Sequence, residues 1–328
     1  MMRNCLDTPP PAITVAAVPD LGAPPVRRPV HHARADCTAD SDGGLTFEVR
    51  LFDGNGKGIA ATGMPEGAAV LLRLRQHQGP DASLRLPLTR AAADDRPRAT
   101  LASAALLREG RWDAFLALPD DEPQRLLPGV HDLRSLAGGV SRHAHAWLGV
   151  RVPYTTKHGN LTVRTWLRRP HAEAGPLRVA ADGITLRASL YGARLTATAC
   201  LEARPRDAAA SPVRVPVRLD GEGDSVRETA PGYGAGSRHP ECDFAAELPL
   251  EPLLSTPGVW DLWLSPSADD EPVRLARILD DVIDKKRVFS YPAQRVASPE
   301  GSEGAVRSVR PYYTVNNNLS VRVSDESA

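Results

Sequence analysis

The sequence predicts an all-β protein built from two tandem antiparallel sandwiches. The 328 residues include 30 prolines and 26 glycines, which interrupt long helices. Several short segments alternate apolar and polar residues with the period of a strand. Three blocks of sequence recur in the same order in the two halves of the chain, which indicates an internal duplication.

The predicted strands are short runs in which apolar residues occupy alternate positions, as in a strand with one buried face. The segment 45–51 reads LTFEVRL and is followed by a turn rich in Gly and Asn. Prolines within two other segments place those strands at sheet edges. Further strands are expected at 70–75, 83–88, 112–118, 161–164, 213–219, 260–264 and 319–322. Many short strands bounded by turns predict immunoglobulin-like sandwiches. The prediction concerns the architecture alone, because the Cys…Trp…Cys pattern of antibody domains is missing.

The repeated blocks define the two predicted sandwiches. The separation between matching blocks increases along the chain, so the second copy should carry longer loops. We assign residues 1–40 to a proline-rich, disordered or extended lead-in, 41–170 to the first sandwich and 178–325 to the second. The matched blocks are Asp42–Phe47 with Asp182–Leu186, Gly110–Leu116 with Gly258–Leu264, and Pro153–Arg164 with Pro311–Arg322.

One segment is ambiguous. The apolar residues of Val273–Phe289 approach helical spacing. The matching stretch of the first copy, Arg125–Arg134, contains Pro-Gly and cannot form one helix. We therefore expect a loop with at most a short helical turn.

Charge and composition exclude several classes of function. Lys and Arg together number 40, as do Asp and Glu, so the formal net charge is zero, which argues against nucleic-acid binding by bulk charge. No run approaches 18 apolar residues, so no membrane span is expected. The amino terminus lacks the pattern of a secretory signal, and the four cysteines lack metal-binding spacing. These features predict a cytoplasmic protein with free thiols.

Two Trp-Asp pairs occupy matching places in the repeat. Trp112-Asp113 and Trp260-Asp261 could provide a stacking surface and an acid for a sugar. Alternatively, each tryptophan is a core residue and its aspartate lies on the opposite face of the strand. Adjacent residues of a strand point to opposite faces, so we favour structural roles for Trp112 and Trp260.

Aromatic and basic residues near the ends of the repeats are the candidates for partner binding. Tyr154, Tyr312 and Tyr313 could form an exposed aromatic rim for a protein or glycan, or pack against a hairpin. Asn160 and Asn318 are expected to have structural roles in the turns that precede the last strands. The run Lys285, Lys286 and Arg287 could contact an anionic partner, or could be a solvated sheet edge.

The sequence predicts no catalytic residue, cofactor or metal. His143 and His145 would share one face of a strand and are weak candidates for metal ligands, but no third ligand has a supporting spacing. Phosphate-binding loops, nucleophile elbows and zinc-protease motifs are missing from the sequence. The acidic clusters lie beside prolines or turns, where charged residues are commonly solvated.

Two segments carry a resemblance to a known group of proteins. Asp270–Pro292 (DEPVRLARILDDVIDKKRVFSYP) and Arg310–Val323 (RPYYTVNNNLSVRV) resemble the carboxy-terminal accessory modules of actinobacterial glycosyltransferases and polyol-phosphate transferases that build cell-wall glycopolymers. Through the repeat, the resemblance extends over about residues 42–325. In that group, sandwich modules follow a catalytic domain and help in acceptor binding or oligomer formation. This sequence has neither a nucleotide-sugar domain nor a DxD metal motif in a Rossmann-like setting, so the resemblance implies a stand-alone accessory protein and no transferase activity.

Three functions are compatible with these observations. The first is a non-catalytic binding or scaffolding protein with a protein partner, such as a glycosyltransferase, because duplicated sandwiches commonly present loops and edges to partners. The second is a carbohydrate-binding module with a glycan ligand. The third is a small enzyme with a site at the junction of the sandwiches, where a cleft would be lined by perturbed acids or by the two histidines.

Overall fold

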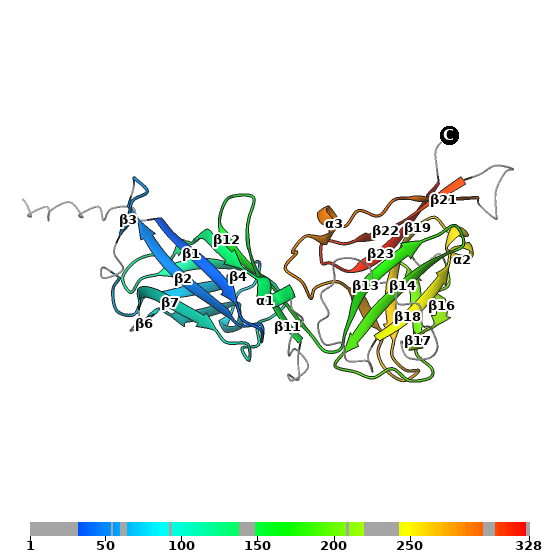
Figure 1. Cartoon of the computed structure of the whole chain (residues 1–328), viewed down its shortest axis with the longest axis horizontal. Helices are drawn as coiled ribbons and strands as arrows, with labels where there is room; N and C mark the ends of the chain where they lie inside the picture. Colours follow the sequence, from blue (N-terminus) through cyan, green and yellow to red (C-terminus); the bar gives the residue numbers. More distant parts are fainter. Residues whose placement is uncertain are drawn as a thin grey trace, which may run out of the picture.

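Strands dominate the chain and fall into two groups that follow one another in the sequence, as the two lobes of Figure 1 show. The structure is a computed structural model that describes residues 32–53, 55–59, 64–91, 94–137, 148–207, 210–219, 243–297 and 306–325. The predicted all-β class is confirmed. In the described ranges, the helices are single short turns: η2 (Pro80–Ala82), α1 (Arg134–Ala137), α2 (Glu251–Leu254) and α3 (Lys285–Val288).

The first group of strands forms two sheets. One has the order β10-β1-β2-β7-β6, with β3 beside β2, and the other has the order β11-β12-β8-β4-β5, with β9 beside β8. All pairings are antiparallel except that of β1 with β10. The strands are β1 (His32–Ala39), β2 (Leu45–Phe52), β3 (Gly58–Ile59), β4 (Ala69–Leu74), β5 (Ser83–Pro87), β6 (Thr89–Ala91), β7 (Asp94–Leu101), β8 (Gly110–Ala117), β9 (Gln124–Arg125), β10 (Leu127–Asp132), β11 (Leu148–Thr155) and β12 (Leu161–Arg168).

The second group forms one sheet of 11 strands. Its main order is β17-β18-β14-β13-β20-β19-β23-β22-β21, and outside this order β15 pairs with β19 and β16 pairs with β15. Its strands are β13 (His171–Val179), β14 (Gly183–Tyr191), β15 (Cys200–Pro205), β16 (Val213–Pro216), β17 (Arg218–Leu219), β18 (Asp243–Pro249), β19 (Gly258–Ser265), β20 (Val273–Ala276), β21 (Gln294–Ala297), β22 (Val306–Tyr313) and β23 (Leu319–Asp325).

Corresponding strands pair in the same way in the two groups. β1 pairs in parallel with β10 and antiparallel with β2, as β13 does with β20 and β14. β8 lies between β12 and β4, as β19 lies between β23 and β15. The groups differ at β20, which pairs with both β13 and β19. In the first group two separate strands make the matching pairings: β10 pairs with β1, and β9 pairs with β8.

Each group encloses a hydrophobic core of its own. The first core contains Phe47 from β2 and Trp112 from β8, so both sheets contribute to it. The second contains Phe244 from β18 and Trp260 from β19. Apolar burial of this kind is the main force that holds strands of opposite layers together.

A segment of the second group also enters the first core. Ala276 and Ile278 are fully buried there, although the strands around them belong to the second group. We call residues 277–284 the strap; it connects β20 to α3 and reaches toward the first lobe (Figure 1). The carboxylate of Glu173 on β13 accepts hydrogen bonds from the backbone N–H groups of Ile278 and Leu279, with N···O distances of 2.9 to 3.1 Å. The strap therefore joins the two lobes through apolar packing and through hydrogen bonds.

Both groups begin earlier in the sequence than we predicted. β1 lies within the segment 1–40 that we assigned to a lead-in, and it is hydrogen-bonded along its length to β2. Its inward side chains are small, including Ala33, Ala35 and Cys37, so the alternation is less visible than in strands with Leu or Val. β13 starts at His171 and contributes Ala172 to the second core, ahead of the predicted boundary at 178. Residues 1–31 lie outside the described ranges.

The predicted strands and turns correspond to observed elements. Pro87 and Pro216 end β5 and β16, which lie at sheet edges. In the turn before β12, the N–H of Thr156 donates to the carbonyl of Asn160 at 2.9 Å, and Gly159 has a positive φ of 75°. Asn317 takes the matching position before β23 with a φ of 59°. The ambiguous segment forms β20, the strap and α3, so it contains one short helical turn.

Candidate functional site

The two Trp-Asp pairs are divided between the core and the surface. Trp112 and Trp260 are buried, with 2% and 1% of their surface exposed. Their indole N–H groups donate to backbone carbonyls four residues earlier, at 3.0 and 3.3 Å. Asp113 and Asp261 point to the opposite faces of β8 and β19 and stay partly exposed. The tryptophans therefore hold the strands in place from the core, while the aspartates are available for hydrogen bonds and ion pairs on the outer faces of the sheets.

Asp113 is the centre of a network of hydrogen bonds on the outer face of the sheet that contains β8. Arg75 donates to Asp113 Oδ1 from Nε at 2.8 Å and from Nη2 at 2.6 Å. Arg125 forms an ion pair with Oδ2 at 2.9 Å, and the Thr162 hydroxyl donates to Oδ1 at 2.9 Å. The donors to this single carboxylate on β8 thus come from β9, from β12 and from the residue that follows β4.

Asp261 is the centre of a matching network on β19. Arg206 and Arg274 each donate from Nη2 to Asp261 Oδ1 at 2.7 Å. The Ser320 hydroxyl donates to the same oxygen at 2.8 Å. Ser320 on β23 is the cross-strand partner of Asp261 on β19. In the same way, Thr162 on β12 is the cross-strand partner of Asp113 on β8. The two networks therefore use the same residue types in the same strand register.

The hydrogen bonds control the charge of both aspartates. Burial disfavours the charged carboxylate of Asp113, but hydrogen bonds from Arg75, Arg125 and Thr162 outweigh it and lower its pKa. The pKa of Asp261 is lowered in the same way, with Arg206 and Ser320 as the donors that oppose burial. Both carboxylates are ionised at neutral pH.

An aromatic ring lies beside each network, under two guanidinium groups. Arg73 and Arg125 lie over the ring of Phe115, 5.2 and 4.9 Å from its centroid. Arg204 and Arg274 lie over Trp263 at 5.1 and 5.3 Å. The arginines occupy the positions that a stacked sugar or base would take.

We call these surfaces the first and second arginine faces. Each contains three arginines around one aspartate, with a fourth arginine, Arg164 or Arg322, on the neighbouring strand. The second face also contains Glu202, whose carboxylate pairs with Arg204 at 2.6 Å. Arginines outnumber acids on both faces, so each carries a local excess of positive charge, although the chain as a whole is neutral. The paired positions are Arg73 with Arg204, Arg75 with Arg206, Asp113 with Asp261, Arg125 with Arg274, Thr162 with Ser320, and Tyr154 with Tyr312.

One further pair of arginines shows where the faces differ. Arg164 on β12 and Arg322 on β23 hold matching positions. Arg164 is only 8% exposed, and it donates to the side-chain oxygen of Asn316 in the second lobe at 3.4 Å. Arg322 is exposed and lies over Tyr312, 5.3 Å from the ring centroid. Part of the first face therefore contacts the second lobe, whereas the second face is more open.

The predicted tyrosines separate into two kinds. Tyr154 and Tyr312 are partly exposed and lie beside Thr162 and Ser320 on the arginine faces. Tyr313, which we expected on the same rim, is fully buried in the second core, in edge contact with Phe289. It follows Tyr312 in a strand and points inward. Burial raises the pKa of the Tyr313 hydroxyl, which stays neutral.

The basic run at 285–287 is also divided. Lys285 is fully buried; its ammonium group pairs with Asp280 and donates to the carbonyl of Val282 in the strap. Burial lowers the pKa of Lys285. A buried, paired lysine cannot contact a partner, so its predicted binding role is wrong. Lys286 and Arg287 are exposed on α3, where Arg287 pairs with Asp284 at 3.3 Å.

Asn318 ends the turn before β23, where its carbonyl accepts the N–H of Thr314 at 2.8 Å, and its neighbour Asn317 is the residue that holds the strap. Asn317 is fully buried and donates from Nδ2 to the carbonyl of Ile283 at 2.9 Å. Its side-chain oxygen accepts the N–H of Lys285 at 3.3 Å. Asn317 has a positive φ of 59°, a conformation that Gly and Asn adopt more readily than other residues, so its residue type is compatible with the turn but does not reveal its contact with the strap.

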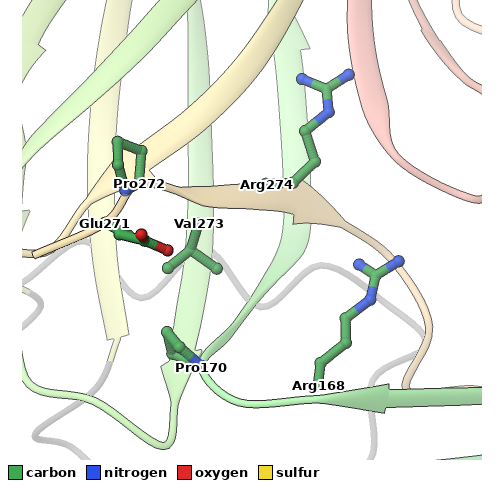
Figure 2. Close-up of a pocket in the computed structure, with 6 residues that line it drawn as sticks. All are labelled: Arg168, Pro170, Glu271, Pro272, Val273 and Arg274. Atoms are coloured by element: carbon green, nitrogen blue, oxygen red, sulfur yellow. The ribbon is translucent and has the colours of Figure 1, made fainter. Parts of the chain in front are cut away.

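A small pocket lies where the two lobes meet. Figure 2 shows Arg168 and Pro170, from the end of β12 and the link to β13, together with residues at the start of β20. Its volume is about 210 Å³, and its residues are Arg168, Pro170, Glu271, Pro272, Val273 and Arg274. The arginine side chains are already engaged, by Glu109 in one case and by Asp261 in the other. Small-molecule sites are commonly larger and more enclosed.

The described residues contain no cluster of three or more His, Cys, Asp or Glu side chains able to hold a metal ion. His143 and His145 lie outside the described ranges, as do Cys5 and Cys242. Cys37 and Cys200 are free thiols. In the part of the chain that the structure covers, no helix has the length and apolar character to cross a membrane.

Sequence reasoning missed the arginines at the centre of the two faces. Arg125 and Arg274 both fall within a recurring stretch, as do Thr162 and Ser320, so comparison of the two halves of the sequence contained this signal. Arg75 and Arg206 lie outside the recurring blocks, and strand register alone brings them to the aspartates.

Neither known family models nor curated proteins match this chain.

Proposed function

We propose that the chain is a non-catalytic binding or scaffolding protein composed of two immunoglobulin-like sandwiches related by duplication, and that the arginine faces contact its protein partner. The duplication is supported by recurring sequence blocks, by the shared order of strand pairing and by two separate cores. A biosynthetic enzyme such as a glycosyltransferase is the partner that the sequence resemblance supports.

The observation that carries the proposal is the match between the two faces at outward positions. Core positions of duplicated domains are constrained by packing, whereas most surface positions can vary with little effect on stability. Exposed ion pairs typically contribute only about 0–1 kcal/mol each. Arg75 and Arg206 are well exposed, so stability alone is a weak reason for both copies to keep them, whereas the more buried aspartates and hydroxyls also stabilise the fold.

The surroundings of the aromatic rings favour an ionic contact over sugar stacking. Among the tryptophans that the structure describes, Trp112, Trp166 and Trp260 are buried, and Trp263 is partly exposed beneath two guanidinium groups. A carbohydrate platform needs an open ring face. Charged outer sides of sheets beside a pocket of only about 210 Å³ suit a macromolecular partner better than a small ligand.

The test is capture of a partner by the tagged full chain from the native lysate, followed by identification of the bound proteins. Arg73 and Arg322 make no ion pair within the described ranges, so Arg73→Glu with Arg322→Glu changes the charge of both faces without unpairing an acid. The control is Arg178→Glu with Arg218→Glu, two exposed arginines on β13 and β17. We expect one protein to be retained by the wild type and the control and lost by the face variant. Capture of nothing, or equal capture by all three, would contradict the proposal.

A further inference from the structure

We infer that the ligand of the arginine faces is an acidic protein surface, whose carboxylates are bound by guanidinium and hydroxyl donors without aromatic stacking. This inference rests on the proposed binding function and specifies the chemistry of the partner. It rests on three features: the faces carry donors that are still available, guanidinium groups cover the aromatic rings, and the pocket beside the second face is small.

Each face has donors beyond those that its own aspartate occupies. Arg73 and Arg322 contact rings and form no ion pair among the described residues. Arg75 and Arg206 bind their aspartates, yet 39% and 48% of their side-chain surface is exposed. Guanidinium groups present several N–H donors in a planar fork that matches a carboxylate. The aspartate in each network holds the arginines in position and neutralises one of their charges. On the second face Glu202 pairs with Arg204 as well, which leaves the charges of the other arginines in excess.

The geometry of the rings argues against a nucleic acid or a neutral glycan. Single-stranded nucleic acids and many sugars bind by stacking on open aromatic faces. Here guanidinium groups lie over Phe115, Trp263 and Tyr312, all within 5.3 Å of the ring centroids. A ligand that approaches these faces meets N–H and O–H donors first.

The shape of the surface favours a folded or extended protein over a polysaccharide chain. The faces are the outer sides of sheets, and the pocket beside the second face has a volume of only about 210 Å³. Charge complementarity on flat surfaces is characteristic of protein–protein association, where it increases the association rate. The excess of positive charge on both faces specifies that the partner surface is acidic.

The duplication gives the interaction two sites in one chain. The strap and the Arg164–Asn316 hydrogen bond connect the lobes, so the two faces are linked in one molecule. Linked sites that engage the same partner increase the overall affinity. Loss of either face should therefore weaken binding, and loss of both should weaken it further.

Fluorescence anisotropy of labelled poly-L-glutamate, titrated with the full chain at low and at physiological salt, tests this inference. We expect saturable binding that is weaker at physiological salt than at low salt, because salt screens interactions between exposed charges. Arg322→Glu and Arg73→Glu should each weaken binding roughly fivefold, and the Arg178→Glu/Arg218→Glu control should bind like the wild type. Quenching of Trp263 should accompany binding to the second face and disappear in Trp263→Phe.

Dextran sulfate and single-stranded DNA are the comparison probes. Failure of poly-L-glutamate to bind, or an equal loss of binding in the control variant, would overturn the inference. Tighter binding of either comparison probe through the same arginines would overturn it as well. If partner capture still depends on Arg73 and Arg322 in that case, the proposed binding function stands and only the acidic protein surface is wrong.

Discussion

At the scale of single residues, the two aspartates are the groups on which the arginine faces depend. Each carboxylate receives donors from two neighbouring strands and from the residue that follows a third, and its pKa is lowered in the folded chain. The unfolded carboxyl has a pKa of about 3.9. A lower pKa in the folded state means that each aspartate stabilises the fold fully above that value and that this contribution is lost as the pH falls through the folded pKa.

Replacement of either aspartate tests this account of the networks. Asp113→Asn and Asp261→Asn should each lower the free energy of unfolding by roughly 1–3 kcal/mol at pH 7, because charged hydrogen bonds are lost and arginines are left unpaired. The difference from wild type should shrink as the pH falls below about 3.9. Urea denaturation at pH 7 and pH 3 measures it. The matched control is Asp42→Asn at an exposed position, and a loss of equal size there would contradict the account.

His171 is a second residue whose ionisation is tied to folding. Its ring is fully buried, its Nε2 lies 2.8 Å from the Glu173 carboxylate, and it stacks near Tyr191. Burial lowers the pKa of His171, although Glu173 and Glu109 oppose this and Arg168 adds to it. The unfolded pKa is about 6.5, so the fold loses stability as the pH falls below that value, because only the unfolded chain readily binds the proton.

The pH dependence of unfolding provides the measurement for His171. Between pH 7 and pH 5, the free energy of unfolding should fall in the wild type and fall less in His171→Gln, which cannot take up the proton. His158→Gln, at an exposed position in a turn, should keep the slope of the wild type. Identical slopes in all three proteins would show that His171 is protonated as easily in the folded chain as in the unfolded one.

At the scale of elements, the strap is the feature that joins the lobes. Glu173 accepts two consecutive backbone N–H groups from it, and Asn317 and Lys285 hold its other end. Glu173→Ala leaves the N–H groups of Ile278 and Leu279 without this acceptor. We expect a loss of roughly 1–3 kcal/mol and faster hydrogen exchange at those two amides. Glu247→Ala on β18 is the exposed control, and unchanged exchange in Glu173→Ala would remove the carboxylate from this role.

The sequence predicted elements better than their connections. Strands with Leu and Val at alternate positions, such as β2 and β4, are evident from their periodicity. β1 escaped prediction because its inward residues are Ala and Cys, which give a weak pattern after a proline-rich segment. The strap and the arginine networks depend on contacts between residues far apart in the chain. Periodicity carries no information on such contacts, although comparison of the recurring blocks in the two halves of the sequence does.

At the scale of the whole molecule, the cores are not independent. Ile278 follows a strand of the second group but is buried in the first core. Ile278→Ala should cost roughly 2–5 kcal/mol. We expect hydrogen exchange to accelerate in β8 and β12 of the first lobe. Leu262→Ala in the second core is the comparison, and its effects should concentrate in β15 and β19. If Ile278→Ala left the first lobe unchanged, the strap would not contribute to its core.

The most direct measurement is the affinity of the captured partner for four proteins: wild type, Arg73→Glu, Arg322→Glu and the double variant. Two matched binding faces predict that each single change weakens binding by a similar factor, that the double change weakens it further, and that added salt reduces these differences. If all four proteins bind the partner equally well, the arginine faces are not its binding surface.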